Sequence, residues 1–291
     1  MFRKILVPLD GSKNAERALP WVRKYAAPFG TPVVLVRVLS KIYPLKGMPF
    51  GAQRKDAEGY LSGVRRLLSL DGIPAMIRLP DDSVAESIVA AAVEEHCSLI
   101  LMTSRGASKV ARWLIGGVTE RVLRLSPVPV LVLRGRPSPD PNPKRILVPM
   151  DGSSRAKRVL PWAERLAFFH KSPLQLLYVQ PKGIPRLGKP PPPRDEIIPT
   201  FARWCSQLRR RGVAATFRLT QGEPAREILA DSGSTDLIAM TTHGYGGLKH
   251  WVLGSIAEKI IHGSQAPVFV FKKRSSAAKL PVPRKRRAEP S

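Results

Sequence analysis

A glycine-rich segment, TTHGYGGLKHWVLGS at residues 241–255, is the part of this sequence best suited to chemistry. It follows the run DLIAM at 236–240 and ends in Gly254 and Ser255, just ahead of a predicted helix at 256–262. Glycine lets a ligand approach the backbone closely. The free N–H groups and the dipole of a helix N-terminus attract anions, and the serine hydroxyl adds a donor. This pattern fits a phosphate-binding loop.

The same segment also fits a simpler role, a flexible connection between a strand and a helix whose start is capped by Ser255. Neither the G-x-x-x-x-G-K-[ST] phosphate loop nor the G-x-G-x-x-G dinucleotide fingerprint occurs there. The spacing alone leaves both interpretations open.

The elements that position this segment come from an internal duplication. RKILVPLDGS at 3–12 returns as KRILVPMDGS at 144–153, and LILMTSRG at 99–106 returns as LIAMTTHG at 237–244. A repeat of about 140 residues has the size of a domain rather than of a solenoid unit. We therefore expect a first domain at 1–135, a proline-rich linker at 136–143, a second domain at 144–272 and a basic, disordered tail at 273–291.

Within each half, short apolar runs alternate with helical patterns, which predicts an α/β fold with a mostly parallel sheet and helices on both faces. In such sheets ligands bind at the carboxyl ends of the strands, where the strand order reverses. The glycine-rich segments follow a predicted strand end, and so do Asp10 and Asp151. The first-half strands are predicted at 4–9, 33–39, 74–79, 99–103 and 128–133.

Both halves resemble the universal stress protein family almost from end to end. The resemblance rests on ILVPLDGS at 5–12, ILVPMDGS at 146–153, the MTTHG…LGS block at 240–255 and the closing apolar strand of each half. It implies two tandem doubly wound domains, each a five-stranded parallel sheet of order 3-2-1-4-5. It also implies binding of ATP, with or without Mg²⁺, through G-x-x-G-x9-G-[ST].

The two halves match that binding motif unequally. The second half has Thr241 where the motif has its first glycine, and otherwise follows it through Gly244, Gly254 and Ser255. The first half also begins with threonine, and it has Gly117 where the motif has a hydroxyl residue. We therefore expect the second domain to be the main nucleotide site.

The resemblance carries over to individual positions. In the second half it implies a nucleoside end lined by Pro149, Asp151, Val179 and Met240, and phosphates held by Gly244, Gly254, Ser255 and Ile256, with Thr241 at the strand end. The weaker first-half counterparts are Pro8, Asp10, Val38, Met102, Gly106, Gly116, Gly117 and Val118. Some of these positions have a plainer alternative: the prolines shape strand ends, Val38, Val179 and both methionines belong to the core, and the aspartates cap the following helix.

A binding or signalling module fits these residues better than an enzyme. A triad of Asp151, His243 and Ser255 would lack a nucleophile elbow, and the first half has arginine and glycine at the last two positions. We expect no catalytic residue and no metal site, with slow ATP hydrolysis as the one activity left open. Cys97 and Cys205 are too few for a disulfide framework. No apolar stretch approaches the ~18–20 residues of a membrane span, so we expect a cytoplasmic protein without a span.

The charge is strongly positive, with 48 Lys and Arg against 22 Asp and Glu and a net charge of +26. Such a field attracts polyanions, although it also serves solubility alone. The alternative function is therefore a protein that binds no nucleotide and uses its basic surface and tail, including residues 284–287, to bind nucleic acid or anionic lipid. We also expect the closing strands at 128–133 and 268–271 to pair the two domains within one chain, with a homodimer as a further possibility.

Overall fold

The structure is a computed structural model of the 291-residue chain. It describes residues 1–39, 49–104, 115–134, 141–153, 156–181, 192–233, 236–241 and 253–271. Residues 136–140 of the predicted linker, and the basic tail, lie outside these ranges.

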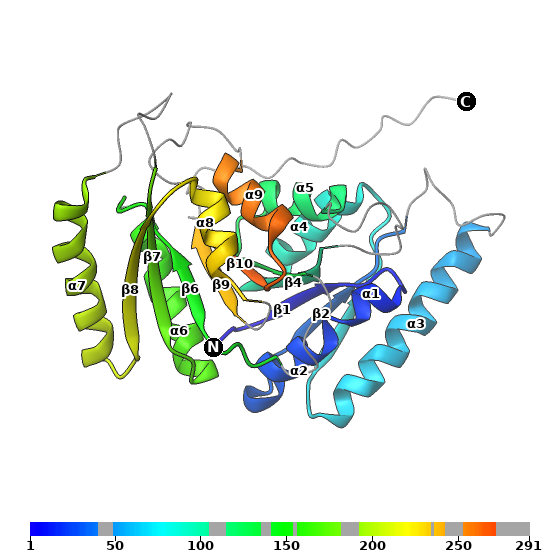
Figure 1. Cartoon of the computed structure of the whole chain (residues 1–291). Helices are drawn as coiled ribbons and strands as arrows, with labels where there is room; N and C mark the ends of the chain where they lie inside the picture. The colour runs from blue at the N-terminus through cyan, green and yellow to red at the C-terminus, as the bar shows by residue number, and fades with distance from the viewer. Residues whose placement is uncertain are drawn as a thin grey trace.

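Ten strands form one continuous sheet in the order β3-β2-β1-β4-β5-β10-β9-β6-β7-β8 (Figure 1). Each half has the order 3-2-1-4-5 with parallel neighbours, so the predicted fold is confirmed for both domains. The inner strands are continuous runs of Val, Ile and Leu, as expected where helices cover both faces. The strands are β1 Ile5–Pro8, β2 Val33–Val36, β3 Ala75–Arg78, β4 Leu99–Thr103, β5 Val130–Leu133, β6 Ile146–Pro149, β7 Leu174–Gln180, β8 Ala215–Gln221, β9 Leu237–Thr241 and β10 Val268–Phe271.

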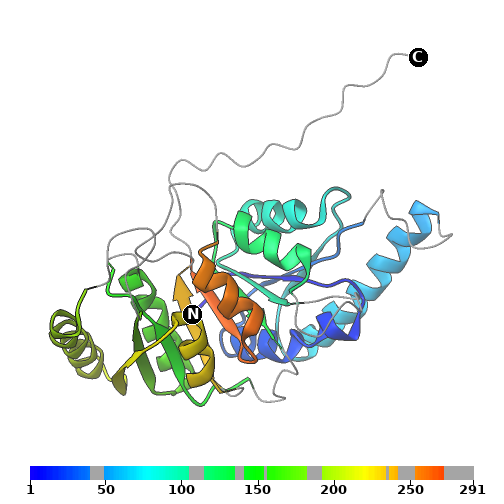
Figure 2. The same ribbon diagram turned by 45° about the horizontal axis from the view of Figure 1, so that its top comes forward.

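The helices form two layers, and each layer closes one of two hydrophobic clusters. One layer contains α1 Lys13–Glu16, α2 Leu19–Ala26 with the short η1 Ala27–Phe29, α3 Phe50–Leu70, η2 Ala156–Val159, α6 Leu160–His170 and α7 Arg194–Arg210. The other contains α4 Val84–Glu94, α5 Gly117–Leu125, α8 Pro224–Asp231 and α9 Ser255–Gly263. Figure 2 shows the second layer, with α5 and α9 next to each other over the middle of the sheet. Alternate residues of each strand face opposite layers, so both clusters run through both domains.

The two domains join through their last strands. β5 and β10 run antiparallel, with Val132 opposite Val268 and Val130 opposite Val270. The predicted pairing of the closing strands within one chain is therefore confirmed. Just after β5, the buried Arg134 side chain donates hydrogen bonds to the carbonyls of His262 and Ser264 at the end of α9. A cation at a helix C-terminus interacts favourably with the helix dipole, so Arg134 strengthens the junction.

Aromatic side chains fill the junction on the other side of the sheet. Tyr25 of α2 and His170 of α6 are both buried, and the Tyr25 hydroxyl lies 2.8 Å from His170 Nε2. Phe169 packs against Tyr25 with ring centroids 5.3 Å apart, and Lys24 lies over the Phe169 ring. Burial, and to a smaller extent the charge of Lys24, lowers the pKa of His170 to about 3. The junction therefore contains a neutral, hydrogen-bonded histidine.

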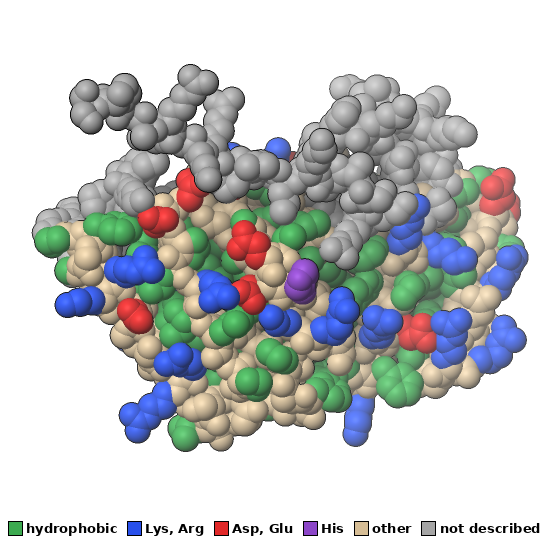
Figure 3. All heavy atoms as spheres, turned by 180° about the vertical axis from the view of Figure 1, so that it is seen from behind, with side chains coloured by type: hydrophobic (Ala, Val, Ile, Leu, Met, Phe, Trp, Pro, Cys, Tyr) green, Lys and Arg blue, Asp and Glu red, His purple; other side chains and the backbone are tan. Residues whose placement is uncertain are grey.

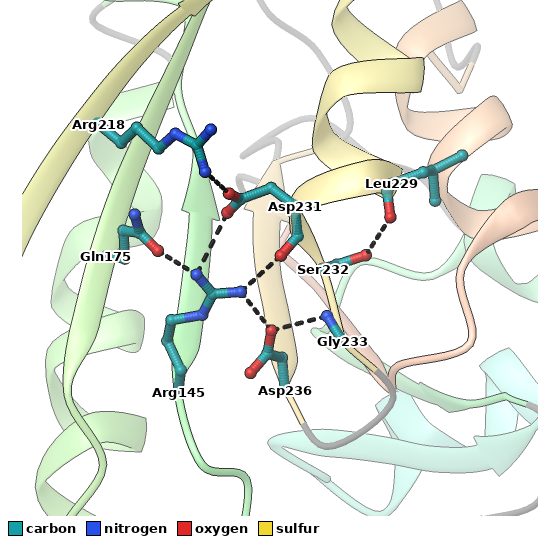
Figure 4. A network of polar contacts seen from close by, with 8 residues as sticks. All are labelled: Arg145, Gln175, Arg218, Leu229, Asp231, Ser232, Gly233 and Asp236. Atoms are coloured by element: carbon teal, nitrogen blue, oxygen red, sulfur yellow. Dashed lines mark hydrogen bonds and ion pairs between the residues drawn. The ribbon is translucent and has the colours of Figure 1, made fainter.

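A polar network closes the amino end of the second domain (Figure 4). Arg145, just before β6, donates to the side chain of Gln175 and to the main-chain carbonyl of Asp231 at the end of α8. It also pairs with the carboxylates of Asp231 and Asp236, at 3.3 and 2.5 Å. Arg218 of β8 pairs with Asp231 as well. The network fixes α8 to the strand starts, far from the strand ends at which a ligand is expected.

Candidate functional site

The candidate site of each domain lies where the strand order reverses. In the second domain β6 has β7 on one side and β9 on the other, and connections from these strands leave at their carboxyl ends in opposite directions. The first domain repeats this arrangement with β1, β2 and β4. This is the edge at which ligands bind in doubly wound sheets.

The loop after β6 is a tight turn that leads into the next helix. Pro149 ends the strand, and the Asp151 carboxylate accepts a hydrogen bond of 3.0 Å from the Ser153 N–H. Gly152 has φ +80°, and the Ser153 hydroxyl accepts from the Ala156 N–H at 3.1 Å. Asp151 therefore shapes the loop, and the serine rather than the aspartate caps the helix.

The N-cap residue of α9 has no side chain that could cap the first backbone amides of the helix. Gly254 is the N-cap, with an extended backbone and no side-chain hydrogen bond to the first turn. Ser255 is exposed, and Ile256 beside it is 42% exposed. These residues present N–H groups, the positive end of the helix dipole and a hydroxyl together, a donor set that suits a phosphate.

The apolar candidates lie in the core beneath this edge. Val179 near the end of β7 and Met240 near the end of β9 are 8% and 5% exposed. Both belong to the cluster that also contains Leu253 and Ala257 from the start of α9. Both side chains are therefore part of the hydrophobic core beneath the candidate site. Thr241, which follows Met240, ends the strand and is partly exposed.

The first domain has the same geometry with different chemistry. Pro8 ends β1, and the Asp10 carboxylate accepts from the Ser12 N–H at 2.9 Å. Gly116 is the N-cap of α5, again without a capping side chain, and is followed by Gly117 and the 40%-exposed Val118. This helix start therefore offers amides but no hydroxyl.

The apolar positions of the first domain also match those of the second. Met102 is 5% exposed and lies in the same cluster as its counterpart, with the partly buried Val38 packed against it. The remaining candidates, Gly106 and Gly244, and also His243, lie outside the described residues.

Sequence reasoning missed how the two domains support the loop after their first strand. In the first domain the Arg37 guanidinium lies beside Gly11, pairs with Asp56 of α3 at 3.1 Å, and faces the Tyr60 ring. Tyr178 occupies the corresponding strand position in the second domain, where it is fully buried. The two repeats read VRV at 36–38 and LYV at 177–179. The exchange of arginine for tyrosine at the middle position is the signal that could have revealed this difference.

In the second domain the loop after β6 is supported by the start of α7. The Tyr178 hydroxyl donates to the Pro192 carbonyl at 2.5 Å. A Cβ on Gly152 would lie only 2.5 Å from Ile197 Cδ1 and 3.1 Å from Pro192. The start of α7 therefore packs closely against the loop that carries Asp151.

The cation carried by α9 is already paired. Lys259 Nζ lies 3.0 Å from the Glu223 carboxylate, which also accepts from the Arg226 N–H at the start of α8. Burial raises the pKa of Glu223, but the bonds from Lys259 and from the backbone outweigh it and hold the pKa below its usual value. An anion at the start of α9 would thus meet amides and a hydroxyl before it meets a free lysine.

Among the residues that the structure describes, no group of three or more His, Cys, Asp or Glu side chains could hold a metal ion. Among the helices described, none is long and apolar enough to cross a membrane.

Fold and site geometry together define a tandem, doubly wound α/β protein with one reversal of strand order in each half. The family model of the universal stress protein family matches residues 1–134 and 142–272, so the chain belongs to that family.

Relatives of similar length confirm the tandem organisation. A universal stress protein of Mycolicibacterium smegmatis is 22% identical, over 93% of this chain and 97% of its own. One of Mycobacterium tuberculosis is 24% identical, over 91% and 96%. The crystal structure of a universal stress protein from Archaeoglobus fulgidus superposes with a TM-score of 0.77 at 25% identity, covering 93% of this chain and 98% of the other.

Proposed function

We propose that this protein is a stress-response signalling protein that binds an adenine nucleotide, ATP or a close relative, mainly in its second domain. The observation that carries the proposal is the start of α9. Its N-cap is Gly254, which has no side chain to cap the first amides, and the exposed Ser255 follows at the sheet edge where the strand order reverses. The family membership of both domains agrees with this assignment.

The residues divide between the two ends of the ligand. Gly254, Ser255 and Ile256 would hold the phosphates through backbone N–H groups and the serine hydroxyl. Pro149 and Asp151 would lie at the nucleoside end, above the buried Val179 and Met240. No described residue is assigned a catalytic role, so the bound nucleotide acts as a signal in this proposal and any hydrolysis is slow.

The test is calorimetric titration of the full chain with ATP, with and without Mg²⁺. We expect one tight site, and Ser255→Ala should weaken it by about 1–2 kcal/mol, the scale of a hydrogen bond to a charged group, or roughly tenfold in affinity. The full chain is used because separating the halves would expose the edges of β5 and β10.

A matched variant in the other half sharpens the result. Gly117→Ser places the same hydroxyl at the start of α5, where both the φ of the glycine and the space around it permit a side chain. We expect it to strengthen a second, weaker site while leaving the first unchanged. Absence of ATP binding by the wild-type chain, or equal affinity of wild type and Ser255→Ala, would contradict the proposal.

A further inference from the structure

The two helix layers differ in their charge balance. The helices α2, α3, α6 and α7 contain eleven Lys and Arg against five Asp and Glu. The helices α4, α5, α8 and α9 on the other face contain four against six. The excess positive charge of the helices therefore lies on one face, the one that closes the first cluster.

Seven of the eleven basic residues lie toward the C-terminal ends of these helices, at positions 23, 24, 65, 66, 165, 209 and 210. Helices between parallel strands run opposite to the strands, so these four ends meet at the amino edge of the sheet, along the bottom of Figure 1. We call residues 23–29, 65–71, 165–171 and 209–211 the lower rim. It contains nine Lys and Arg and one acidic residue, Asp71, which pairs with Arg23 at 2.6 Å, and its Arg211 pairs with the adjoining Glu164 at 3.0 Å.

The lower rim also exposes large apolar side chains. Phe29 is 58% exposed, Leu67 48%, Leu70 79% and Phe168 63%, and these are four of the seven exposed large hydrophobic residues in the described part of the chain. Phe29 of the first domain lies 6.1 Å from the Phe169 ring of the second, so the patch crosses the domain junction. In the view from behind (Figure 3), the lowest side chains are blue and green, and the red ones lie farther up.

Cations and exposed apolar side chains on one surface fit an anionic lipid bilayer. Anionic headgroups attract Lys and Arg, while Phe and Leu enter the boundary between headgroups and acyl chains. A nucleic acid duplex would use the cations but would gain nothing from four solvated Phe and Leu side chains. We propose that the lower rim is a peripheral binding surface for anionic lipid bilayers, with Phe29, Leu67, Leu70 and Phe168 inserted at the interface.

This surface lies at the edge of the sheet opposite the candidate nucleotide site. The rim is at the amino ends of the strands, whereas Ser255 and Gly117 follow carboxyl ends. A chain attached by its rim would keep both ligand edges exposed to water. The proposal therefore stands independently of nucleotide binding.

The experiment is sedimentation of the full chain with vesicles of phosphatidylcholine alone or mixed with phosphatidylglycerol, at several salt concentrations. Wild type should bind the anionic vesicles only, and less at high salt. Arg65→Glu with Arg209→Glu should weaken binding roughly tenfold or more. The matched control, Arg121→Glu with Arg226→Glu, makes the same change in net charge on the opposite face and should leave binding close to wild type.

A second pair of variants separates lipid insertion from charge alone. Phe29→Ser with Phe168→Ser keeps the net charge, and both side chains are exposed, so the fold should persist while vesicle binding weakens. Equal binding by the rim variant and its control, or no effect of the two serines, would overturn the proposal. Two other outcomes would also overturn it. One is binding of duplex DNA that depends on the rim, without binding to vesicles. The other is self-association that the two serine substitutions abolish, in a protein that does not bind vesicles.

Discussion

The buried histidine at the domain junction makes stability depend on pH. His170 is 7% exposed, accepts or donates one hydrogen bond with Tyr25 through Nε2, and has no described partner at Nδ1. Protonation would place a charge in this aromatic cluster, with Lys24 as a nearby like charge. Burial first, and Lys24 second, hold the pKa of His170 at about 3.

The magnitude follows from proton linkage. An unfolded histidine has a pKa of about 6.5, so between pH 6.5 and 3 the unfolded chain binds a proton that the folded chain does not. The contribution of the neutral His170 to the free energy of unfolding is therefore fully present above pH 6.5 and is lost as the pH falls toward 3. At pH 4.5 the two pKa values imply a loss of roughly 3 kcal/mol from this group alone.

Urea unfolding of wild type and His170→Gln between pH 7 and 4.5 measures this contribution. The glutamine amide can bond to the Tyr25 hydroxyl but does not titrate in this range. We expect the variant to be less stable at pH 7 and the difference to shrink or reverse by pH 4.5. If the two curves of unfolding free energy against pH run parallel, His170 is not excluded from protonation in the folded chain and the reasoning fails.

Three further variants test the packing of the junction and of the loop near the site. Val130→Lys buries a charge in the β5–β10 pair, which should lower the free energy of unfolding by about 3–5 kcal/mol and separate the domains. Small-angle X-ray scattering should then report a more elongated molecule, whereas unchanged compact dimensions would count against pairing through this strand. Arg134→Gln should lower the urea midpoint through a loss of about 2–4 kcal/mol, because it weakens two charge-assisted bonds, and a loss below about 1 kcal/mol would show that the bonds matter little. Gly152→Ala should destabilise the fold more than Gly11→Ala. The two glycines have similar positive φ angles, +80° and +84°, but only a Cβ at Gly152 would lie 2.5 Å from Ile197. Equal effects of the two variants in urea unfolding would leave backbone strain as the whole cause.

Most of the architecture could be read from the sequence, because repeated apolar runs and serine caps are local signals. The strand order came with the family resemblance. Strand ends were less accurate: the run at 33–39 predicted a longer strand than β2, which ends at Val36. The reason is not local, since β2 ends where its partners β1 and β3 end, at Pro8 and Arg78.

The candidate site was predictable where it depends on one turn and unpredictable where it depends on packing between elements. The helix start at Gly254 and the cap at Ser12 follow from residue type. The Arg37–Asp56 pair beside the first-domain loop and the Tyr25–His170 contact at the domain junction do not, because each joins side chains from separate elements. The second of these exists only because the β5–β10 pairing brings α2 and α6 together.

The antiparallel β5–β10 pairing within one chain also fixes the ratio of the two domains. Two copies of a one-domain chain would present two identical candidate edges and would separate on dilution. Here one polypeptide joins a serine-bearing edge to a glycine-bearing edge, so every molecule holds one of each at a fixed ratio at any concentration. Each edge can also change by mutation without altering the other, which allows one half to specialise while the other drifts.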